Sequence, residues 1–300
     1  MEIKKAIIPV AGLGTRFLPL SKEIPKEIWP LVDKPILQYI VEEVIKSGIK
    51  EIIFVSRPEK KVIWNYFSKV DLELKRILKE RKKEEILKEV EDFEKIFKEI
   101  SFSRYASFSQ VYQKKLLGDG HAIYQAKKKV KREAVAVLFG DDVIESKKPV
   151  ILQMIEVFKK YQKPIIALYP IEKERISSYG VVAGNEIEKR IFKIEKIIEK
   201  PKPEEAPSNL AIVGRYILTP EVFEYLRKAK VGKTGEIHLS EAFQKMIEEG
   251  KEILGYQFEG KWLECGNKVN YLKCVLYLSL KHPKFGDKIK KYLDDILKNM

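Results

Sequence analysis

The sequence predicts an α/β protein whose central sheet is mixed, mainly parallel, and flanked by helices. Residues 6–10 (AIIPV) form a short apolar, β-branched run, which is typical of a buried strand. Residues 35–48 begin with proline, repeat apolar residues at helical spacing and end with glycine, so they predict a helix with both boundaries. Residues 51–55 (EIIFV) predict a second buried strand. The order strand, helix, strand is typical of parallel pairing.

Length and composition indicate a globular protein. The 300 residues are 45% hydrophobic, enough for a sizeable core, and no apolar run approaches the roughly 20 residues that a membrane span needs. The N-terminal apolar run is too short for a signal peptide. The two cysteines, Cys265 and Cys274, lack the partners that a zinc site or a disulfide framework needs. We therefore expect a cytoplasmic protein without a membrane partner.

The charge pattern argues against nucleic acid as a partner. The net charge is +14, from 58 basic and 44 acidic residues, but the charges are mostly interspersed Lys and Glu without a compact Arg-rich block. Residues 71–100 are the most charged segment. Their apolar spacing predicts a helix, broken once, with a largely solvated face. This segment is either an exposed excursion or a subunit contact.

The loop after the first strand is a candidate phosphate site. It reads Ala11-Gly12-Leu13-Gly14-Thr15-Arg16, and its two glycines permit close approach of the backbone to an anion. Thr15 and Arg16 add a hydroxyl and a forked cation, and Lys26 and Glu27 follow. The spacing fits neither a Walker loop nor the dinucleotide fingerprint. The alternative is an ordinary turn with solvated cations.

A second candidate site follows the strand predicted for residues 108–112. Gln113 has the paired donors and acceptor that suit the edge of a pyrimidine base, and Gly118 and Gly120 would let a base lie flat against the backbone. His121 more often packs or starts a helix than acts as a catalyst. This part of the chain therefore predicts a base pocket.

Paired carboxylates mark a candidate metal site. The apolar run of residues 134–140 predicts a strand, and Asp141 and Asp142 come directly after it. Open α/β sheets bind ligands at the carboxyl ends of their strands, and carboxylate oxygens suit Mg²⁺ held together with substrate phosphates. The alternative is an aspartate that caps the next turn.

The second half of the chain predicts three more strands, at residues 164–169, 208–218 and 253–258. A strand-like run also ends at Glu199 and Lys200, where a carboxylate can bind sugar hydroxyls and an ammonium a phosphate. Residues 235–239 open another helix, and helices from about residue 267 close the chain.

Several of these segments together resemble a known family. The segments AGLGTRFLP, PKE, QxxxxGxGHA, the aspartate at a strand end, EKP and AIVGRY occur in order from residue 6 to residue 267. This series is similar to that of the sugar-1-phosphate nucleotidylyltransferases, and within them to the bacterial-type UTP–glucose-1-phosphate uridylyltransferases. The resemblance implies a Rossmann-like nucleotidyltransferase fold.

The resemblance also implies a domain plan and a reaction. It implies a single domain over residues 1–300, with a nucleotide-binding half at about 1–163, a sugar-binding half at about 164–266 and C-terminal helices at 267–300. The implied reaction is UTP plus glucose 1-phosphate giving UDP-glucose and pyrophosphate, with Mg²⁺ as cofactor. We expect a homo-oligomer that binds small molecules. Alternatives are a related enzyme that uses dTTP or another sugar phosphate, and a non-catalytic regulatory or nucleic-acid-binding protein on the same fold.

The resemblance assigns roles residue by residue. Arg16, Lys26 and Lys200 are implied as the catalytic cations. The metal would be held by Asp141 and by Glu264, although relatives carry an aspartate where Glu264 stands. The implied nucleotide contacts are Ala11, Gly12, Gly14, Thr15, Glu27, Gln113 and Gly118. The implied sugar-phosphate contacts are Gly180, Glu199, Lys200 and Val213.

Overall fold

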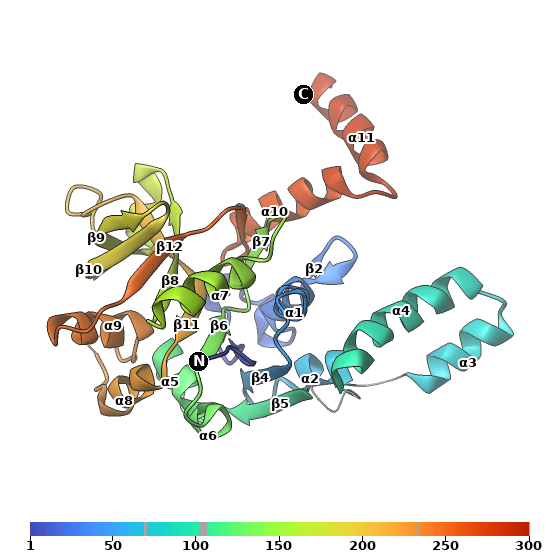
Figure 1. Cartoon of the computed structure of the whole chain (residues 1–300). Helices are drawn as coiled ribbons and strands as arrows, with labels where there is room; N and C mark the ends of the chain where they lie inside the picture. Colours follow the sequence, from blue (N-terminus) through green and yellow to red (C-terminus); the bar gives the residue numbers. More distant parts are fainter. Residues whose placement is uncertain (69–70, 102–106, 233, 300) are drawn as a thin grey trace.

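The computed structural model describes residues 1–68, 71–101, 107–232 and 234–299 (Figure 1). Within them, nine strands form one sheet in the order β5-β4-β1-β6-β11-β8-β12-β10-β9. Their bounds are β1 Lys5–Pro9, β4 Glu51–Ser56, β5 Ser107–Tyr112, β6 Val135–Leu138, β8 Ile165–Pro170, β9 Gly180–Glu188, β10 Ile191–Glu199, β11 Leu210–Leu218 and β12 Leu254–Gln257. Two smaller sheets join β2 Pro30–Leu31 to β3 Lys34–Pro35 and β7 Asp142–Glu145 to β13 Lys261–Glu264.

The prediction of a mixed sheet is confirmed. The first half pairs in parallel, since β1 lies between β4 and β6 and β5 continues from β4. Among the described strands of the second half, only β8 and β12 are parallel neighbours, and β11, β10 and β9 pair in antiparallel fashion. Parallel pairing is therefore less dominant than the sequence indicated, because the second half is built from antiparallel connections.

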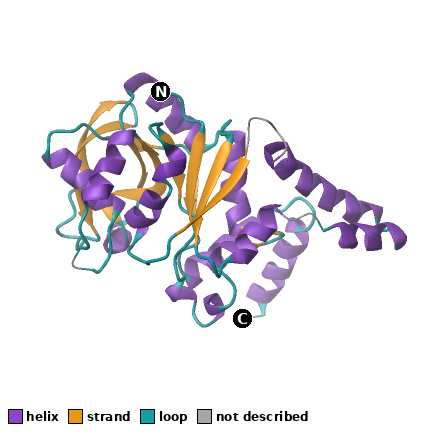
Figure 2. Ribbon diagram, turned by 90° about the horizontal axis from the view of Figure 1, so that it is seen from below, coloured by secondary structure: helices purple, strands orange, loops and turns teal. Residues whose placement is uncertain are grey.

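Helices cover both faces of the sheet (Figure 2). Alternate residues of β1 point to opposite faces, so Ile8 packs in one apolar cluster with α1 and α7, and Ile7 packs in another with α5, α8 and α9. Short 3-10 helices lie at Thr15–Phe17, Leu20–Lys22, Lys26–Ile28 and Lys173–Ser178. The α-helices are α1 Ile36–Lys46, α2 Lys61–Ser68, α3 Leu72–Glu80, α4 Glu84–Ser101, α5 Asp119–Gln125, α6 Lys127–Val130, α7 Val150–Tyr161, α8 Pro220–Lys228, α9 Leu239–Glu248, α10 Lys268–Lys281 and α11 Gly286–Lys298.

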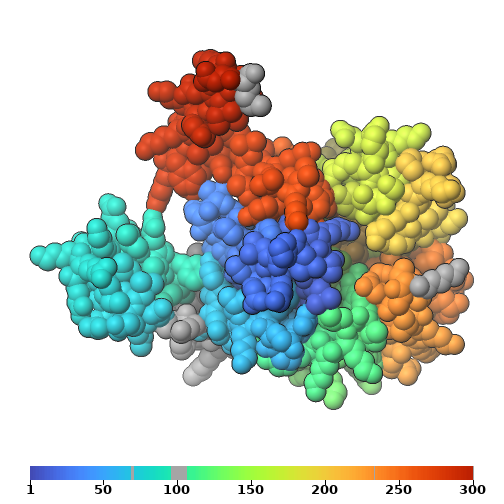
Figure 3. Space-filling view, turned by 180° about the vertical axis from the view of Figure 1, so that it is seen from behind, coloured from blue at the N-terminus to red at the C-terminus, as the bar shows by residue number. Residues whose placement is uncertain are grey.

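The charged segment forms a helical hairpin that projects from the body of the molecule (Figure 3). Helices α3 and α4 meet at a turn in which Lys82 adopts a positive φ of 55°. The side chain of Asp71 accepts a hydrogen bond of 2.9 Å from the Leu74 N–H and so caps α3. A helix broken once, as the sequence predicts, is confirmed. Among the described residues, no helix has the length and apolar character needed to cross a membrane.

Two residues of the predicted site lie on strands of the second half. Gly180 opens the long strand β9. Glu264 comes after the strand predicted for residues 253–258, which is confirmed as β12, and it ends the further strand β13, where it lies opposite Asp142 of β7. Among the described residues, β7 and β13 are four residues each and pair with one another, and strands of this length are too short for their periodicity to be read from the sequence. Their pairing brings Glu264 to the end of β6.

Candidate active site

The loop after β1 turns sharply at Gly14. This residue has φ 65° and ψ 36°, in the left-handed region, and it precedes the short 3-10 helix Thr15–Phe17. Ser21 fixes the turn, because its hydroxyl donates a hydrogen bond of 2.8 Å to the Gly14 carbonyl. The loop lines a pocket of about 410 Å³ together with Lys26, Glu27, Gln113, Gly118 and Asp141. The predicted nucleotide-site residues are thus brought together.

Lys26 and Asp141 form a direct ion pair at the floor of this pocket. Burial would raise the pKa of Asp141, but the ammonium of Lys26 and the guanidinium of Arg16 hold it below its ordinary value. Burial would also lower the pKa of Lys26, but Asp141 and Glu27 hold it above its ordinary value. Both groups are therefore charged at neutral pH.

Asp142 has a different environment from its neighbour. Burial and the negative charge of Asp141 raise the pKa of Asp142 to about 7. Its carboxylate accepts hydrogen bonds from the indole N–H of Trp262 at 2.8 Å and from the Gly214 N–H at 3.2 Å. The negative charge of Asp141 thus disfavours ionisation of Asp142, and a cation beside the two carboxylates would relieve this repulsion.

Lys60, which the sequence did not single out, holds the loop and Glu27 together. Its buried ammonium donates to the Val10 carbonyl at 2.7 Å and to the Glu27 carboxylate at 3.0 Å. Burial lowers the pKa of Lys60 despite the nearby Glu27. Glu27 is itself buried, so its role in the structure is to anchor this corner of the pocket.

Gln113 is oriented by two hydrogen bonds. Its amide nitrogen lies 2.9 Å from the Gly118 carbonyl and 3.0 Å from Nδ1 of His121. Because the nitrogen serves these protein groups, the carbonyl Oε1 is the atom that the amide offers to a ligand. Burial and Lys115 lower the pKa of His121, so the ring is neutral and suited to this positioning contact.

Gly118 is required by the packing of the chain itself. It has φ 91°, and a Cβ there would lie 2.7 Å from the Ile237 carbonyl oxygen. A base lying flat against the backbone is one reason for a glycine at this position. The structure adds a second reason, which is the close approach of residues 236–237.

A second pocket, of about 230 Å³, adjoins the first. The two share Asp119, Phe139 and Asp141, so one cavity continues into the other. The second pocket contains Arg16, Gly180, Glu199, Lys200 and Glu264 from the predicted set. Arg16 therefore lines the second pocket, and its Nη1 is 3.5 Å from the Gly266 carbonyl oxygen.

Glu199 and Lys200 lie where β10 ends, opposite the start of β9. Glu199 is the register partner of Gly180, and Lys200 donates its N–H to the Tyr179 carbonyl at 3.1 Å. The Lys200 ammonium is 3.4 Å from the Glu199 carboxylate, and both side chains are partly exposed. The pairing of β9 and β10 thus brings the two predicted residues to the pocket wall.

Val213 is the predicted residue that the structure does not bring to either pocket. Ile212 and Gly214 line the second pocket, whereas the Val213 side chain points to the other face of β11 and is fully buried in the core. The alternation of a strand explains this, because neighbouring side chains face opposite sides.

Glu264 reaches the second pocket but is already engaged by three donors. Its Oε2 accepts hydrogen bonds from the Tyr179 hydroxyl and the Asn270 amide and lies 3.3 Å from Nη2 of Arg175. Within the part of the chain that the structure describes, no three His, Cys, Asp or Glu side chains are grouped to hold a metal ion. Asp141 and Asp142 are adjacent, and Glu264 is anchored nearby.

Arg215 and Asp119 are two further residues that sequence reasoning missed. Arg215 is fully buried and donates to Glu43 of α1 and to the Asp142 carbonyl oxygen. Asp119 lines both pockets and lies 3.7 Å from His238, whose pKa it raises by hydrogen bonding. An arginine inside an otherwise apolar strand was the signal for Arg215. The sequence contains no comparable signal for Asp119, because this residue stands between two glycines.

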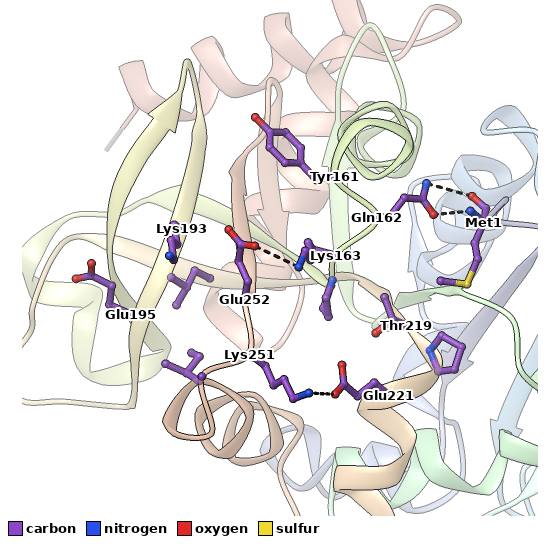
Figure 4. Close-up of a pocket in the computed structure, with 15 residues that line it drawn as sticks. Met1, Tyr161, Gln162, Lys163, Lys193, Glu195, Thr219, Glu221, Lys251 and Glu252 are labelled. Carbon is purple, nitrogen blue, oxygen red and sulfur yellow. Dashed lines mark hydrogen bonds and ion pairs between the residues drawn. The ribbon is translucent and has the colours of Figure 1, made fainter.

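Another cavity lies elsewhere in the molecule. It has a volume of about 840 Å³ and shares no residue with the two pockets described above (Figure 4). Four of its charged residues form two ion pairs, Lys163 with Glu252 at 3.2 Å and Lys251 with Glu221 at 2.7 Å. The joined pockets at Asp141 are a better candidate site, because their charges lie at strand ends and loops suited to ligands.

The chain is similar to known proteins over almost its whole length. A family model described as nucleotidyl transferase matches residues 5–279. The chain is 39% identical over 295 residues to a UTP–glucose-1-phosphate uridylyltransferase of Staphylococcus haemolyticus, which covers 98% of this chain and 99% of the relative. It is 37% identical over 296 residues to the enzyme of the same name from Bacillus subtilis, with 99% and 98% covered.

Solved structures show the same similarity. A UDP-glucose pyrophosphorylase complexed with UDP-glucose has a TM-score of 0.82 at 37% identity and covers 93% of this chain and 100% of its own. A UTP-bound UGPase from Acinetobacter baumannii has a TM-score of 0.85 at 35% identity, with 97% and 98% covered. The resemblance inferred from the sequence motifs and the predicted fold are thereby confirmed. The chain belongs to the nucleotidyl transferase family.

Proposed function

We propose that this protein transfers a uridylyl group from UTP to glucose 1-phosphate and releases pyrophosphate. The observation that carries the proposal is the junction of two pockets at Asp141, one lined by the loop after β1 and the other by the ends of β9 and β10. Relatives that match this chain over nearly its whole length carry the name of this activity. Solved relatives contain UTP or UDP-glucose.

The first pocket is proposed to bind UTP. The turn at Gly14 and the backbone of residues 11–15 would receive the phosphates, as successive N–H groups do at anion sites. The Gln113 carbonyl Oε1 would accept the N3–H of uracil, because the amide nitrogen is occupied by Gly118 and His121. Cytosine lacks that N–H, so this contact would favour uracil.

The second pocket is proposed to bind glucose 1-phosphate. Glu199 offers carboxylate oxygens to sugar hydroxyls, and Lys200 and Arg16 offer cations to the phosphate. Gly180 leaves room for the hexose beside Glu199. Val213 would contribute only through the backbone of β11, since its side chain lies in the core.

The chemistry is an in-line displacement. A phosphate oxygen of glucose 1-phosphate forms a bond to the α-phosphorus of UTP, the bond from that phosphorus to the bridging oxygen breaks, and pyrophosphate leaves with the electron pair. A phosphate is already a nucleophile at neutral pH, so the residues need not remove a proton. Unit charges 4 Å apart interact by ~4 kcal/mol at an effective dielectric near 20. Arg16, Lys26 and Lys200 therefore lower the repulsion between two polyanions.

The carboxylates are proposed to hold Mg²⁺. Asp141 and Asp142 are hard oxygen donors, and their mutual repulsion, which raises the pKa of Asp142 to about 7, fits a cation site. Glu264 would be the further ligand, directly or through a water, once it gives up one of the three hydrogen bonds that it accepts in this structure. When bound, Mg²⁺ would screen the phosphate charges. Lys26, whose ammonium pairs with Asp141, would lie beside this cation and could contact the phosphates as a second positive charge.

A panel of nucleotides against sugar phosphates tests the proposal. Pyrophosphate release should be fastest with UTP and glucose 1-phosphate and slower with dTTP, CTP, ATP or GTP. Discrimination against dTTP should be partial, because a methyl group is worth only ~1–3 kcal/mol. A clear preference for dTTP, or for another sugar phosphate, would make the chain a different sugar nucleotidylyltransferase. Absence of pyrophosphate release with every pair would refute catalysis.

A further inference from the structure

Asp119 is a carboxylate at the junction of the two pockets, and the proposed reaction gives it no role. It lines both pockets, and its side chain is 32% exposed. It opens helix α5, which packs against α9, and α9 packs against β10 (Figure 1). One wall of the second pocket is thus built where α5, α9 and β10 meet.

The side chain of Asp119 is held by one of its two oxygens. Oδ1 accepts hydrogen bonds from the N–H of Gly120 at 2.6 Å and from the N–H of Leu239, the first residue of α9, at 3.0 Å. Nδ1 of His238 lies 3.7 Å from the same oxygen. Within the described part of the chain, Oδ2 makes no comparable contact. The carboxylate is therefore oriented, and Oδ2 is the oxygen that remains for a ligand.

Asp119 belongs to a polar wall of the second pocket. His238 and Ser240 line this wall from the start of α9, and Glu199 lines it from the end of β10. The Ser240 hydroxyl donates to Glu199 Oε2 at 3.4 Å. A hydrogen bond and the charge of Asp119, together with the charge of Glu199, raise the pKa of His238. Both carboxylates therefore lie near one imidazole, in a cavity of about 230 Å³.

The chemistry of this wall suits hydroxyl groups and not phosphate. An ionised carboxylate only accepts hydrogen bonds, so it matches the O–H donors of a sugar and repels another anion. The cations Arg16 and Lys200 line the same pocket and attract a phosphate. A sugar phosphate that places its phosphate at these cations leaves its neutral ring to meet the carboxylates of Glu199 and Asp119.

The hexose fits this wall better than the ribose of the nucleotide does. Asp119 also borders the first pocket, where a ribose would lie. However, its Oδ1 is held by residues 238–239, and within the described chain the other members of its wall line the second pocket alone. The oxygen that remains therefore serves the same cavity as Glu199.

We propose that Asp119 determines specificity for the sugar phosphate, because its Oδ2 accepts a hydrogen bond from a hexose hydroxyl that Glu199 does not bind. This inference rests on the proposed function, since it names a contact of the same site. The two N–H donors at Oδ1 hold the carboxylate in place before the ligand arrives, so little ordering is needed on binding. A hexose without this hydroxyl would leave the carboxylate without its donor and would bind more weakly.

Asp119→Asn separates the contact with the ligand from the contacts within the protein. An asparagine keeps an oxygen at Oδ1 for the N–H groups of Gly120 and Leu239, and it places an amide nitrogen where Oδ2 stands. Its thermal melt should therefore match that of the unaltered protein. Glu241→Gln removes the same charge from the first turn of α9, at an exposed position outside both pockets, and is the matched control.

Isothermal titration of the full chain with UDP-glucose and with UDP tests the proposal, because UDP lacks the hexose. Asp119→Asn should weaken UDP-glucose binding by about fivefold or more and change UDP binding by less than about twofold, since a charged acceptor makes the stronger hydrogen bond. Glu241→Gln should change neither. Analogues of UDP-glucose that each lack one hexose hydroxyl then identify the contact. One of them should bind the unaltered protein about fivefold more weakly than UDP-glucose, and this difference should disappear in Asp119→Asn and persist in Glu241→Gln.

Two results would overturn the proposal. Equal losses for UDP and UDP-glucose in Asp119→Asn would place the contact on the nucleotide. Unchanged UDP-glucose binding in that variant, with the difference for every analogue retained, would show that the carboxylate only caps the start of α9. Either result leaves the proposed function standing if the unaltered protein releases pyrophosphate from UTP and glucose 1-phosphate. A protein that neither binds UDP-glucose nor releases pyrophosphate would refute both.

Discussion

Arg215 of β11 donates to Glu43 of α1 inside the protein, with Nη2 at 2.8 Å from one carboxylate oxygen and Nε at 3.1 Å from the same oxygen. Arg215 has no exposed surface. Its Nη2 also donates to the Asp142 carbonyl at 2.5 Å, and its Nη1 donates to the Gly214 carbonyl at 3.0 Å. One buried guanidinium thus connects a helix, a strand and the segment that carries the acidic pair.

Loss of this guanidinium should destabilise the fold. Arg215→Met should lower the free energy of unfolding by ~3–5 kcal/mol, because it leaves the Glu43 carboxylate buried without its partner. Denaturant titration gives this value. Arg76→Met, which removes exposed pairs with Glu73 and Glu80, is the control and should cost less than about 1 kcal/mol. Equal losses of unfolding free energy in the two variants would show that the buried network stabilises the fold no more than an exposed ion pair does.

Lys26 and Lys200 should be needed for turnover and not for folding. Lys26→Ala and Lys200→Ala should each lower kcat/KM by about 10- to 150-fold, since a charged hydrogen bond is worth ~1.5–3 kcal/mol. Steady-state kinetics with a thermal melt would measure both effects. Lys22→Ala and Lys202→Ala change exposed neighbours and should leave kinetics unchanged. Near-normal kcat/KM in Lys26→Ala or Lys200→Ala would remove that residue from the site.

Gln113 should set the base preference. Gln113→Ala should weaken UTP binding by about fivefold, the value of one hydrogen bond near 1 kcal/mol, and leave glucose 1-phosphate affinity almost unchanged. Isothermal titration with each substrate measures this. Gln110→Ala changes a residue on β5, the strand that precedes Gln113, and outside the pocket, so it is the control. Equal losses for the sugar phosphate and UTP would contradict the assignment of a base pocket.

Glu264 should affect the metal requirement less than Asp141 does. Glu264→Gln should raise the Mg²⁺ concentration for half-maximal rate, and Asp141→Asn should raise it further, because Glu264 is held by Tyr179, Arg175 and Asn270. Glu264→Asp keeps the charge and should be milder than Glu264→Gln. An unchanged Mg²⁺ requirement in Glu264→Gln would show that this carboxylate only anchors its three donors.

The sequence predicted those parts of the site that sit on strong local patterns. The strand before Gly12, the helix of residues 35–48 and the strand before Asp141 all combine an apolar run with a glycine or proline boundary. Their order also predicted that their carboxyl ends meet. The amide of Gln113 after a predicted strand already suggested a base contact, and the family motifs added the support for Glu199 and Lys200, whose spacing alone has no such signal.

The remainder depends on contacts between distant segments. The ion pair of Lys26 with Asp141 joins residues 115 positions apart, and no local pattern predicts such a contact. Lys60 looked like one of many surface lysines, although it is buried against Glu27. The strands β7 and β13 were too short to recognise, so the donors that hold Glu264 were not foreseen.

The most direct test of the central claim follows the phosphate oxygen of the sugar substrate. Glucose 1-phosphate labelled with ¹⁸O at its non-bridging oxygens is incubated with UTP and Mg²⁺, and the products are examined by ³¹P NMR. Attack of that oxygen on the α-phosphorus predicts UDP-glucose with ¹⁸O in the bridge between its two phosphorus atoms and pyrophosphate without label. Label in pyrophosphate, or pyrophosphate formed without labelled UDP-glucose, would contradict the account.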